Sequence, residues 1–524
     1  MAESSRDISG LGLEALKVLL VQALEDNARL KAETVELREE IARLKGLKGR
    51  PKLRPSGMEQ ASGKGSRRKG RRGAKRAKLN IGETRIVKPD TLPAGARFKG
   101  YEDYVVQDII IKPHTILFRR ERWLLPSGET VVAALPREAA SHFGPELKRF
   151  VISQYHQGQV TIPRLFTQLR DLGIDISRRQ IVRLLNEKQD AFHEEAREVL
   201  RAGLGAASWV TVDDTGARHK AKNSYCTHIG NDGFAWFATT GSKSRINFLE
   251  LLRAGRKDYI INAAALDYMR EHKLPKATIS LLTAATERHF ADEEAYLAHL
   301  EKLGFNDLKV HPDPVRVATE GALWGTIAAE GHFGGTMVVS DGAGQFRLAD
   351  HALCWVHAER LIHKLETFCD EHRQAKERVR GRIWWFYDDL KAYRQAPTAR
   401  RARELSRRFD RIFSTTTGSA TLDRLLTRLL ARKKELLAVL ERPEIPLHTN
   451  GSENDIRCQV TRRKISGGTR SDQGRDCRDA FLSLMKTCAK QAVSFWGYLG
   501  ARLGVVGAAQ TPRLAQLIRQ AVPT

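Results

Sequence analysis

Apolar residues recur along residues 11–45 at two positions of a seven-residue repeat, with Glu, Lys and Arg around them. The apolar stripe is narrow, lasts roughly five repeats and contains Asn27, the kind of residue that fixes register in two-stranded coils. The pattern predicts a coiled coil through which the chain forms homo-oligomers; the alternative is an amphipathic helix that packs on its own chain. One row holds Leu13, Leu20, Asn27, Thr34 and Ile41, and the other holds Leu16, Ala23, Leu30, Leu37 and Leu44.

Short alternating apolar runs between residues 101 and 133 predict a small antiparallel sheet, with turns at Pro113 and at PSG, residues 126–128. From residue 136 to residue 200 the apolar spacing becomes helical. The chain therefore passes from a small β module into a helical region.

Residues 160–187 within that helical region predict a helix, a turn around Gly173 and a second helix capped near Ser177. This order is a helix-turn-helix candidate, and its second helix carries Arg178, Arg179 and Arg183. Helix pairs with glycine turns are common, so DNA reading and ordinary packing are equally open from this spacing.

Strands return after residue 207, in the runs SWVTVDD, NSYCTHIGN and FAWFATT, and the helical run RINFLELLRAG follows them. The order strand, strand, strand, helix is how a ribonuclease-H-like sheet begins. Residues 256–330 are mostly helical and interrupt this sheet, and GTMVVSDGAGQF, residues 335–346, supplies another apolar strand. Residues 355–440 are helical and rich in Arg; we expect the aromatic residues of RIWWFYDDLKAY there to be core rather than a base-stacking platform.

These patterns predict a multidomain, mixed α/β protein with a ribonuclease-H-like core and helical insertions. The expected divisions are a coiled coil (1–46), a basic linker (47–85), a small β module (86–135), a helix-turn-helix-like region (136–204), the first part of the core (205–354, with an insertion at about 256–330), a helical insertion (355–440) and the end of the core with C-terminal helices (441–524).

The charge of the chain favours a polyanionic partner. Its 524 residues include 88 Lys and Arg against 62 Asp and Glu, a net charge of +26. Nucleic acid is the first candidate, although net charge alone does not exclude an anionic membrane surface. Residues 49–78 contain mainly Gly, Ser, Pro, Lys and Arg; we expect them to be disordered in the free protein and to contact DNA phosphates, the alternative being a solvated linker. The basic side chains expected to contact DNA are Arg67, Arg68, Lys69, Arg71, Arg72, Arg178, Arg179, Arg183, Arg457, Arg462, Arg463, Lys464 and Arg470.

The six cysteines are scattered without a C-x-x-C pair, which favours neither a disulfide framework nor a four-cysteine zinc site. The N-terminus has no signal-peptide pattern, and no apolar run is long enough to span a bilayer. We therefore expect a soluble protein of a reducing cytoplasm with no membrane partner.

Two carboxylates follow apolar strands, Asp213 after SWVTV and Asp341 after MVVS. Ligands collect at the carboxyl ends of strands in open α/β sheets, so both side chains could face one cleft. Mg²⁺ prefers oxygen ligands, and paired ions support phosphoryl transfer. Glu453, just inside a helix that begins near Asn450 or Ser452, is the third candidate. The alternative is that Asp213 caps a turn and Glu453 is only a favourable charge at a helix N-terminus.

Four sequence blocks resemble the signatures of the bacterial insertion-sequence-66 family of transposases, within the DDE superfamily: TVDDTGA, VVSDGAGQF, ALCWVHAER and LHTNGSENDIRCQVTRRKISGGTRSDQGRD. The resemblance implies that Asp213, Asp341 and Glu453 are catalytic and bind Mg²⁺, with Mn²⁺ as an alternative. It places Asp214 where the family has glutamate, in an accessory role, with Asn450 nearby. The likeness covers most of the chain.

The chain departs from the family pattern in three ways. No Cys precedes Cys226, so the small module lacks the family's paired zinc ligands. The interval from Asp213 to Asp341 is longer than the family pattern suggests, which an insertion explains. ISGGTR replaces the Trp-containing segment expected after Arg463 and Lys464, which weakens any DNA contact inferred for that segment.

Cys354 and His357 could form a zinc site with His363 and Cys369. On a helical stretch, however, this spacing does not point all four side chains one way. We therefore expect no zinc, and the resemblance implies that Cys354 and His357 support the active site by packing and hydrogen bonding.

The function that these observations favour is a transposase that cuts DNA and joins element ends to target DNA. The alternatives are a non-catalytic DNA-binding regulator or architectural protein on a nuclease-like fold, and a structure-selective nuclease. The resemblance also implies a nucleoid-associated bacterial protein and accessory proteins encoded nearby.

Overall fold

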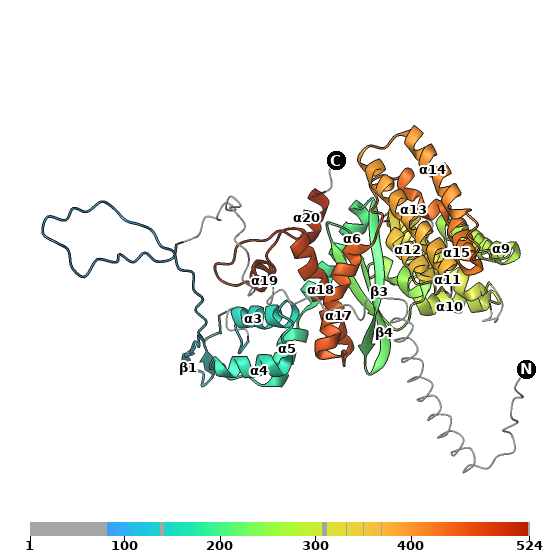
Figure 1. The fold of residues 1–524 in the computed structure, drawn as a ribbon. Coiled ribbons are helices and arrows are strands. Elements are labelled where there is room, and N and C mark those ends of the chain that lie inside the picture. Colours follow the sequence, from blue (N-terminus) through green and yellow to red (C-terminus); the bar gives the residue numbers. More distant parts are fainter. Residues whose placement is uncertain are drawn as a thin grey trace, which may run out of the picture. The chain divides into compact units, whose positions relative to one another are not determined.

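The computed structural model describes residues 81–136, 141–305, 312–331, 333–348, 350–367 and 369–521. The heptad segment and residues 47–80 of the basic linker, with the five candidate DNA-binding residues from Arg67 to Arg72, lie outside these residues. The chain divides into two compact units, Met1–Val106 and Gln107–Thr524. The described part of the first unit, residues 81–106, contains neither helix nor strand, and the elements drawn in Figure 1 belong to the second unit.

The expected small sheet over residues 101–133 is reduced to one hairpin. Strands β1, Arg122–Leu124, and β2, Thr130–Val132, pair antiparallel. Residues 104–112 form no strand, and the apolar side chains of Tyr104 and Ile110 are exposed. An apolar run becomes a strand only when a facing element covers it, and among the described residues this run has no such partner.

Four helices follow, and two of them form the expected helix-turn-helix shape. Ser177 caps the second helix of this pair: its side chain accepts from the backbone N–H of Gln180, whose side chain accepts from the backbone N–H of Ser177. Gly173 has φ of 83° in the turn, a conformation that suits glycine. Ile181 of the second helix and Leu165 of the first are fully buried. The helices are α3, Pro145–His156; α4, Ile162–Asp171; α5, Arg178–Asn186; and α6, Asp190–Ala206.

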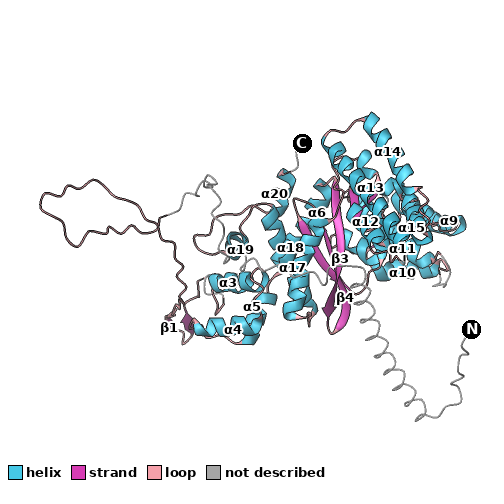
Figure 2. Cartoon of the chain, in the orientation of Figure 1, coloured by secondary structure: helices cyan, strands magenta, loops and turns pink. Residues whose placement is uncertain are grey.

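A mixed five-stranded sheet lies at the centre of the second unit, drawn in magenta in Figure 2. Its strand order is β5-β4-β3-β8-β9. Strand β3 pairs antiparallel with β4 and parallel with β8, so the sheet changes direction at β3. The expected order of three strands and a helix is thus confirmed. The strands are β3, Trp209–His219; β4, Lys222–Gly230; β5, Ala235–Thr240; β8, Met337–Ser340; and β9, His351–Leu353.

C-terminal helices cover the antiparallel side of this sheet. Helix α17 spans Asn450–Ser466 and α18 spans Asp472–Lys490. The Ser483 hydroxyl accepts from the backbone N–H of Phe237 over 2.9 Å, so α18 binds the edge strand β5 directly. Covering an edge strand removes its free backbone donors. Helices α19, Phe495–Leu503, and α20, Leu514–Gln520, complete this part.

The segment between β5 and β8 is mostly helical, as expected, and also contains a two-stranded ladder. Its elements are α7, Arg245–Leu252; β6, Tyr259–Ile260; α8, Ala263–Glu271; α9, Lys276–Ala284; β7, His289–Phe290; α10, Glu293–Lys302; and α11, Pro314–Ala329.

The second helical insertion packs around Trp355, which contacts the rings of Phe386 and Phe409. The expectation that the aromatic residues of this segment are core is right for Phe386 but wrong for Trp384 and Trp385, which are exposed. The insertion contains α12, Trp355–His363; α13, Asp370–Gln395; α14, Ala399–Phe413; α15, Ala420–Leu430; α16, Lys433–Leu436; and the short helix η3, Ala438–Leu440. In the described part of the chain, no helix has the length and apolarity needed to cross a membrane.

Candidate active site

Asp213 lies in β3, and Asp341 directly follows β8, the parallel neighbour of β3. The last registered pair between β3 and β8 is Thr211 with Val339, and each aspartate lies two residues further along the chain. Neighbouring strands are about 4.8 Å apart, and the negative charge of Asp341 acts on the pKa of Asp213, so the two carboxylates lie near each other. The structure thus brings these two predicted residues together.

The prediction that the first strand ends at Asp213 is wrong. Strand β3 continues to His219, paired with β4 alone. What ends near Asp213 is the parallel part of the sheet, because β8 stops at Ser340. Asp213 is therefore left without a strand neighbour on the β8 side because β8 ends, and not because β3 itself ends.

The charge of Asp213 is poorly compensated by the protein. Burial, together with the negative charges of Asp341 and Asp214, raises the pKa of Asp213 from its usual 3.8 to about 6. The backbone N–H of Asp214, which donates to Asp213 Oδ1 over 2.8 Å, acts in the opposite direction. A cationic ligand beside Asp213 would relieve this repulsion.

Asp214 is compensated by its own partners. Its side chain is 6% exposed and pairs with Lys243 Nζ, and Gln345 Nε2 donates to its other oxygen over 2.8 Å. Gln345 belongs to the short helix η2, Gly344–Phe346, directly after Asp341. Asp214 therefore fastens the segment after Asp341 to β3, and neither Lys243 nor Gln345 was identified by sequence reasoning.

Glu453 lies in the first turn of α17, and its neighbour Ser452 ties that turn to the sheet. The Ser452 hydroxyl, fully buried, donates to Thr211 Oγ1 over 2.6 Å. The Thr211 hydroxyl donates to the carbonyl of Gly230, and His228 Nδ1 lies 3.0 Å from Ser452 Oγ. Because the Ser452 proton is used toward Thr211, the ring N–H of His228 donates to Ser452.

The second ring nitrogen of His228 approaches Asp455, which lies one turn along α17 from Ser452. His228 Nε2 lies 3.4 Å from Asp455 Oδ2, and Lys490 Nζ lies 3.0 Å from the same oxygen. Burial would raise the pKa of Asp455, but its hydrogen bond to His228 and the nearby positive charges outweigh this and lower the pKa to about 2. These buried contacts fix the rotation of α17; sequence reasoning missed His228 because it lies more than 200 residues from its partners.

Two basic side chains approach Glu453 without hydrogen bonding to it. Glu453 Oε1 lies 3.6 Å from His357 Nε2 and 3.8 Å from Arg360. This oxygen is buried and has no hydrogen-bond partner. Buried polar atoms are usually satisfied, so Glu453 Oε1 has the properties of a ligand atom.

Cys354 and His357 form a pair at the start of α12. Their hydrogen bond is the main cause that raises the pKa of His357. Burial would raise the pKa of the Cys354 thiol, but the hydrogen bonds from His357 outweigh it and lower that pKa. The negative charge of Asp341 also raises the pKa of His357. All six cysteines are free, and Cys369 is exposed.

Whether the site suits a metal ion depends on the carboxylate oxygens of Asp213, Asp341 and Glu453. Among the described residues, no three His, Cys, Asp or Glu side chains are grouped closely enough to hold a metal ion as they stand. The donor chemistry nevertheless fits a hard cation, because the charge of Asp213 is poorly compensated and Glu453 has a buried oxygen without a hydrogen-bond partner. Asn450 is exposed at the start of α17.

The candidate DNA-binding residues differ in their exposure and in their contacts with the rest of the chain. Arg178, Arg179 and Arg183 are exposed on α5, as are Arg457, Lys464 and Arg470 on or after α17. Arg462 is only 8% exposed, and it donates to the carbonyl of Tyr155 over 2.5 Å with its guanidinium 3.7 Å from the Tyr155 ring. Arg463 donates to the carbonyl of Gly216 in β3. Arg462 and Arg463 therefore hold α17 in place, rather than facing a partner.

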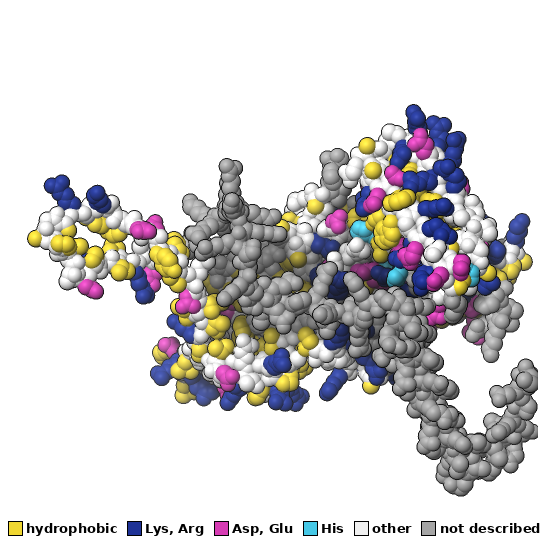
Figure 3. Space-filling view, in the orientation of Figure 1, with side chains coloured by type: hydrophobic (Ala, Val, Ile, Leu, Met, Phe, Trp, Pro, Cys, Tyr) yellow, Lys and Arg dark blue, Asp and Glu magenta, His cyan; other side chains and the backbone are white. Residues whose placement is uncertain are grey.

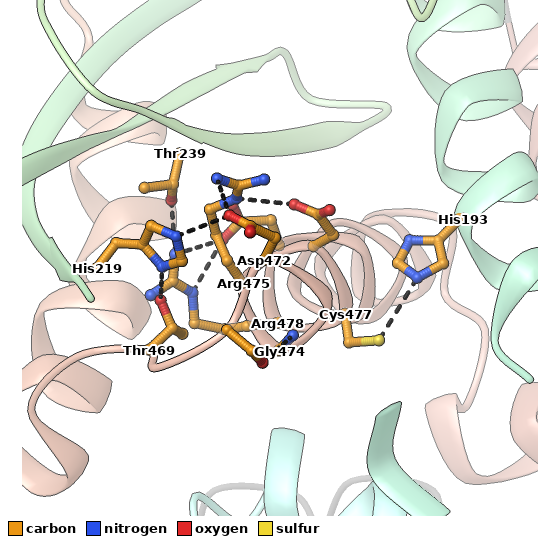
Figure 4. Close-up of polar contacts among 12 residues, drawn as sticks. His193, His219, Thr239, Thr469, Asp472, Gly474, Arg475, Cys477 and Arg478 are labelled. Atoms are coloured by element: carbon orange, nitrogen blue, oxygen red, sulfur yellow. Dashed lines mark hydrogen bonds and ion pairs between the residues drawn. The ribbon is translucent and has the colours of Figure 1, made fainter. Parts of the chain in front are cut away.

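The loop between α17 and α18 is fastened to the tip of the β3–β4 hairpin (Figure 4). His219 Nδ1 lies 2.9 Å from Thr469 Oγ1, and His219 Nε2 lies 3.0 Å from Asp472 Oδ1. A Cβ at Gly468 would lie 2.4 Å from the carbonyl oxygen of Arg218, so only glycine allows this approach. The loop carrying Arg470 is thereby held beside the sheet; its two consecutive glycines were the signal available in the sequence.

Comparison with known proteins identifies the family of the chain. Residues 321–476, which include Asp341 and Glu453, match the family described as Transposase IS66 family. The uncharacterized protein y4jO of Sinorhizobium fredii (strain NBRC 101917 / NGR234) is 49% identical over 320 residues, which cover 61% of this chain and 99% of that protein. The chain belongs to the transposase IS66 family.

Proposed function

We propose that this protein is a DNA transposase that catalyses metal-dependent strand cleavage and strand transfer of an insertion sequence element. The observation that carries the proposal is that Asp341 follows the end of β8, beside the part of β3 that carries Asp213, with Glu453 on a helix bonded to β3 through Ser452 and Thr211. The mixed sheet, with its change of direction at β3, supports a ribonuclease-H-like core.

Asp213, Asp341 and Glu453 are the proposed catalytic residues and ligands of Mg²⁺, with Mn²⁺ as an alternative. The bound cations would supply an activated water and stabilise the charge that develops on the phosphate oxygens. Lys243 neutralises Asp214 and so leaves Asp213 and Asp341 to hold cations. Arg360 and His357, which approach Glu453 Oε1, limit the orientations of the Glu453 side chain.

The reaction has two steps that share one site. In the first, water attacks a phosphodiester at an element end, the P–O bond breaks, and a 3′-hydroxyl is released. In the second, that hydroxyl attacks a target phosphodiester, a new P–O bond forms, and the target's own 3′-oxygen leaves. Neither step needs an oxidant or a nucleotide cofactor.

DNA is the proposed partner, at both the element ends and the target. Exposed Arg457, Lys464 and Arg470 extend from the end of α17 that carries Glu453 along the helix and into the following loop. Phosphate contacts of this kind position DNA without reading its sequence. Helix α5, with its capped N-terminus and three exposed arginines, is the proposed reader of element ends.

Several further features of the proposal concern assembly and location. We infer that residues 11–45 form homo-oligomers and that residues 49–78 contact phosphates. We further propose small accessory proteins encoded nearby and a cytoplasmic, nucleoid-associated location, which the resemblance to the family supports.

The test is a strand-transfer experiment with DNA that carries the inverted repeats flanking the gene. The proposal expects a joined product with the full chain and Mg²⁺, and none with Asp341→Asn. Release of cleaved ends without joining would favour a structure-selective nuclease. Unchanged joining by Asp341→Asn would overturn the assignment of the site, and absence of cleavage by the parent chain with DNA binding intact would favour a regulator.

A further inference from the structure

Two adjacent tryptophans on α13 point to solvent where core residues were expected. Trp385 is 69% exposed and Trp384 is 38% exposed, whereas Ile383 and Phe386 on either side are buried. A large exposed indole loses favourable burial, and aromatic side chains in such positions are characteristic of binding surfaces.

Trp385 shares its helix face with two arginines. Arg378, Arg382 and Trp385 follow one another at spacings of four and three residues, the spacing of neighbours on a helix surface. Within the described residues, neither Arg378 nor Arg382 makes an ion pair or a side-chain hydrogen bond. The nearby acidic Glu377 is instead paired with Arg380. The two arginines thus remain available to a partner.

This face of α13 borders α14. Asp389 lies four residues after Trp385 on the same face, and it pairs with Arg401 over 2.7 Å and with Arg408, both on α14. The Arg408 guanidinium also lies over the Phe386 ring. The Arg378–Trp385 row therefore lies on the side of α13 from which Asp389 reaches α14.

Helix α14 carries three more exposed arginines. Arg403, Arg407 and Arg411 follow at spacings of four residues and form no ion pair among the described residues; Arg403 donates only to the carbonyl of Ala399. Figure 3 shows dark blue side chains gathered over α14 and α13 at the upper right. We call the six residues Arg378, Arg382, Trp385, Arg403, Arg407 and Arg411 the tryptophan–arginine surface.

We propose that the tryptophan–arginine surface binds single-stranded nucleic acid, with the arginines on phosphates and Trp385 stacked on an unpaired base. The inference rests on the proposed function only in taking DNA as the partner, since none of the six residues belongs to the carboxylate site. Five arginines without acidic partners match a phosphate backbone. The exposed indole favours a single strand, because unpaired bases offer a free π-face whereas the bases of a duplex are already stacked on each other.

The surface is connected to the helix beside the carboxylates. Arg380 of α13 donates to Glu359 of α12 over 2.5 Å, and α12 also carries His357 and Arg360, which approach Glu453. A strand held on α13 and α14 is therefore held by the same helical insertion that lines the candidate active site.

The experiment measures binding of the full chain to a labelled oligothymidine strand and to a duplex of equal length, with EDTA present so that no cleavage occurs. Trp385→Ala is expected to weaken single-strand binding about tenfold and to change duplex binding less than about twofold. The double variant Arg378→Ala/Arg382→Ala is expected to lose one to two phosphate contacts. The slope of log affinity against log salt concentration should become shallower accordingly, since each contact contributes about 0.7 to it.

Matched controls separate the surface from general charge and from folding. Arg519→Ala removes an exposed, unpaired arginine of α20 and should leave both affinities unchanged. Because Trp385 is exposed, Trp385→Ala should keep the parent melting temperature, and Trp385→Phe should retain most single-strand binding. Unchanged single-strand affinity in Trp385→Ala overturns the proposal. A change in sedimenting mass without any change in DNA affinity overturns it too, and identifies a protein-docking surface instead.

Failure of this inference can be distinguished from failure of the proposed function. Asp341→Asn should bind the single strand like the parent chain, because Asp341 lies outside the surface. Loss of single-strand binding in Trp385→Ala supports the surface even if Asp341→Asn retains cleavage.

Discussion

Ser452 donates a 2.6 Å hydrogen bond to Thr211, and this contact joins the helix that carries Glu453 to the strand that carries Asp213. Glu453 directly follows Ser452, and Asp213 lies two residues after Thr211. His228 supports the same contact from β4. A buried hydrogen-bond chain thus sets the orientation of two residues that are 240 positions apart in sequence (Asp213 to Glu453).

Ser452→Ala should reduce both stability and strand cleavage. It leaves His228 without its acceptor and frees the start of α17, with an expected loss of about 1–3 kcal/mol in the free energy of unfolding. A displacement of Glu453 by about 1 Å would lower the cleavage rate by up to about a hundredfold. Thermal unfolding and cleavage rates check both effects, with Ser466→Ala at the exposed end of α17 as the control. Parent cleavage in Ser452→Ala, measured well below its melting temperature, would contradict the positioning role.

Lys243→Met should leave the buried carboxylate of Asp214 without its cation. Removing one partner of a buried pair is costly, but the Lys243 side chain is 45% exposed, so we expect a loss of about 1–3 kcal/mol rather than the larger values seen for fully buried pairs. Adding Asp214→Asn should recover part of this stability, because Gln345 still has an oxygen to bind. A double-mutant cycle by chemical denaturation measures the coupling, and additive losses would show that the two side chains do not interact.

Asp213→Asn should change how stability depends on pH. The pKa of Asp213 is raised from 3.8 to about 6 in the folded chain, so the folded state binds the proton more tightly than the unfolded state. The stability from protonated Asp213 is complete below the unfolded pKa and is lost as pH rises through about 6. In metal-free buffer, Asp213→Asn should therefore melt higher than the parent chain above about pH 6, and this advantage should vanish near about pH 4. A constant difference across that range would show that the Asp213 pKa is not raised.

Arg462 and Lys464, two residues apart, should behave oppositely. Arg462→Ala removes buried contacts with Tyr155 and should lower the melting temperature. Lys464→Ala, at an exposed position, should keep the melting temperature, weaken duplex binding and reduce the salt slope by about one. Thermal unfolding and salt-dependent binding separate the two effects. Equal loss of DNA affinity at parent stability in both variants would show that Arg462 faces DNA after all.

Local patterns in the sequence were enough to predict the elements that position the site. Strand periodicity located β3 to β5 and β8, and the serine and glycine around residues 173–177 located the turn before α5. These predictions succeeded because periodicity, caps and turns depend on residues close together in the chain.

The contacts around the carboxylates could not be predicted in the same way. Lys243, His228 and Thr211 reach their partners only through tertiary folding. Lys243 and His228 lie in no short motif, and the motif TVDDTGA, which contains Thr211, does not show that Thr211 binds Ser452. The sequence also suggested a full sheet for residues 101–133 and a core position for Trp385; apolar character alone does not show whether a facing element is present. Arg462 and Lys464 are equally basic, and only packing separates their environments.

The central claim, that Asp213, Asp341 and Glu453 together hold divalent cations, is tested most directly by calorimetric titration of Mn²⁺ into the full chain with a DNA duplex present. We predict saturable binding by the parent chain and a loss of affinity of at least about tenfold, or 1.4 kcal/mol, in each of Asp213→Asn, Asp341→Asn and Glu453→Gln. Asp388→Asn, at an exposed carboxylate of α13, should bind like the parent. Parent-like Mn²⁺ affinity in Asp341→Asn would contradict the account.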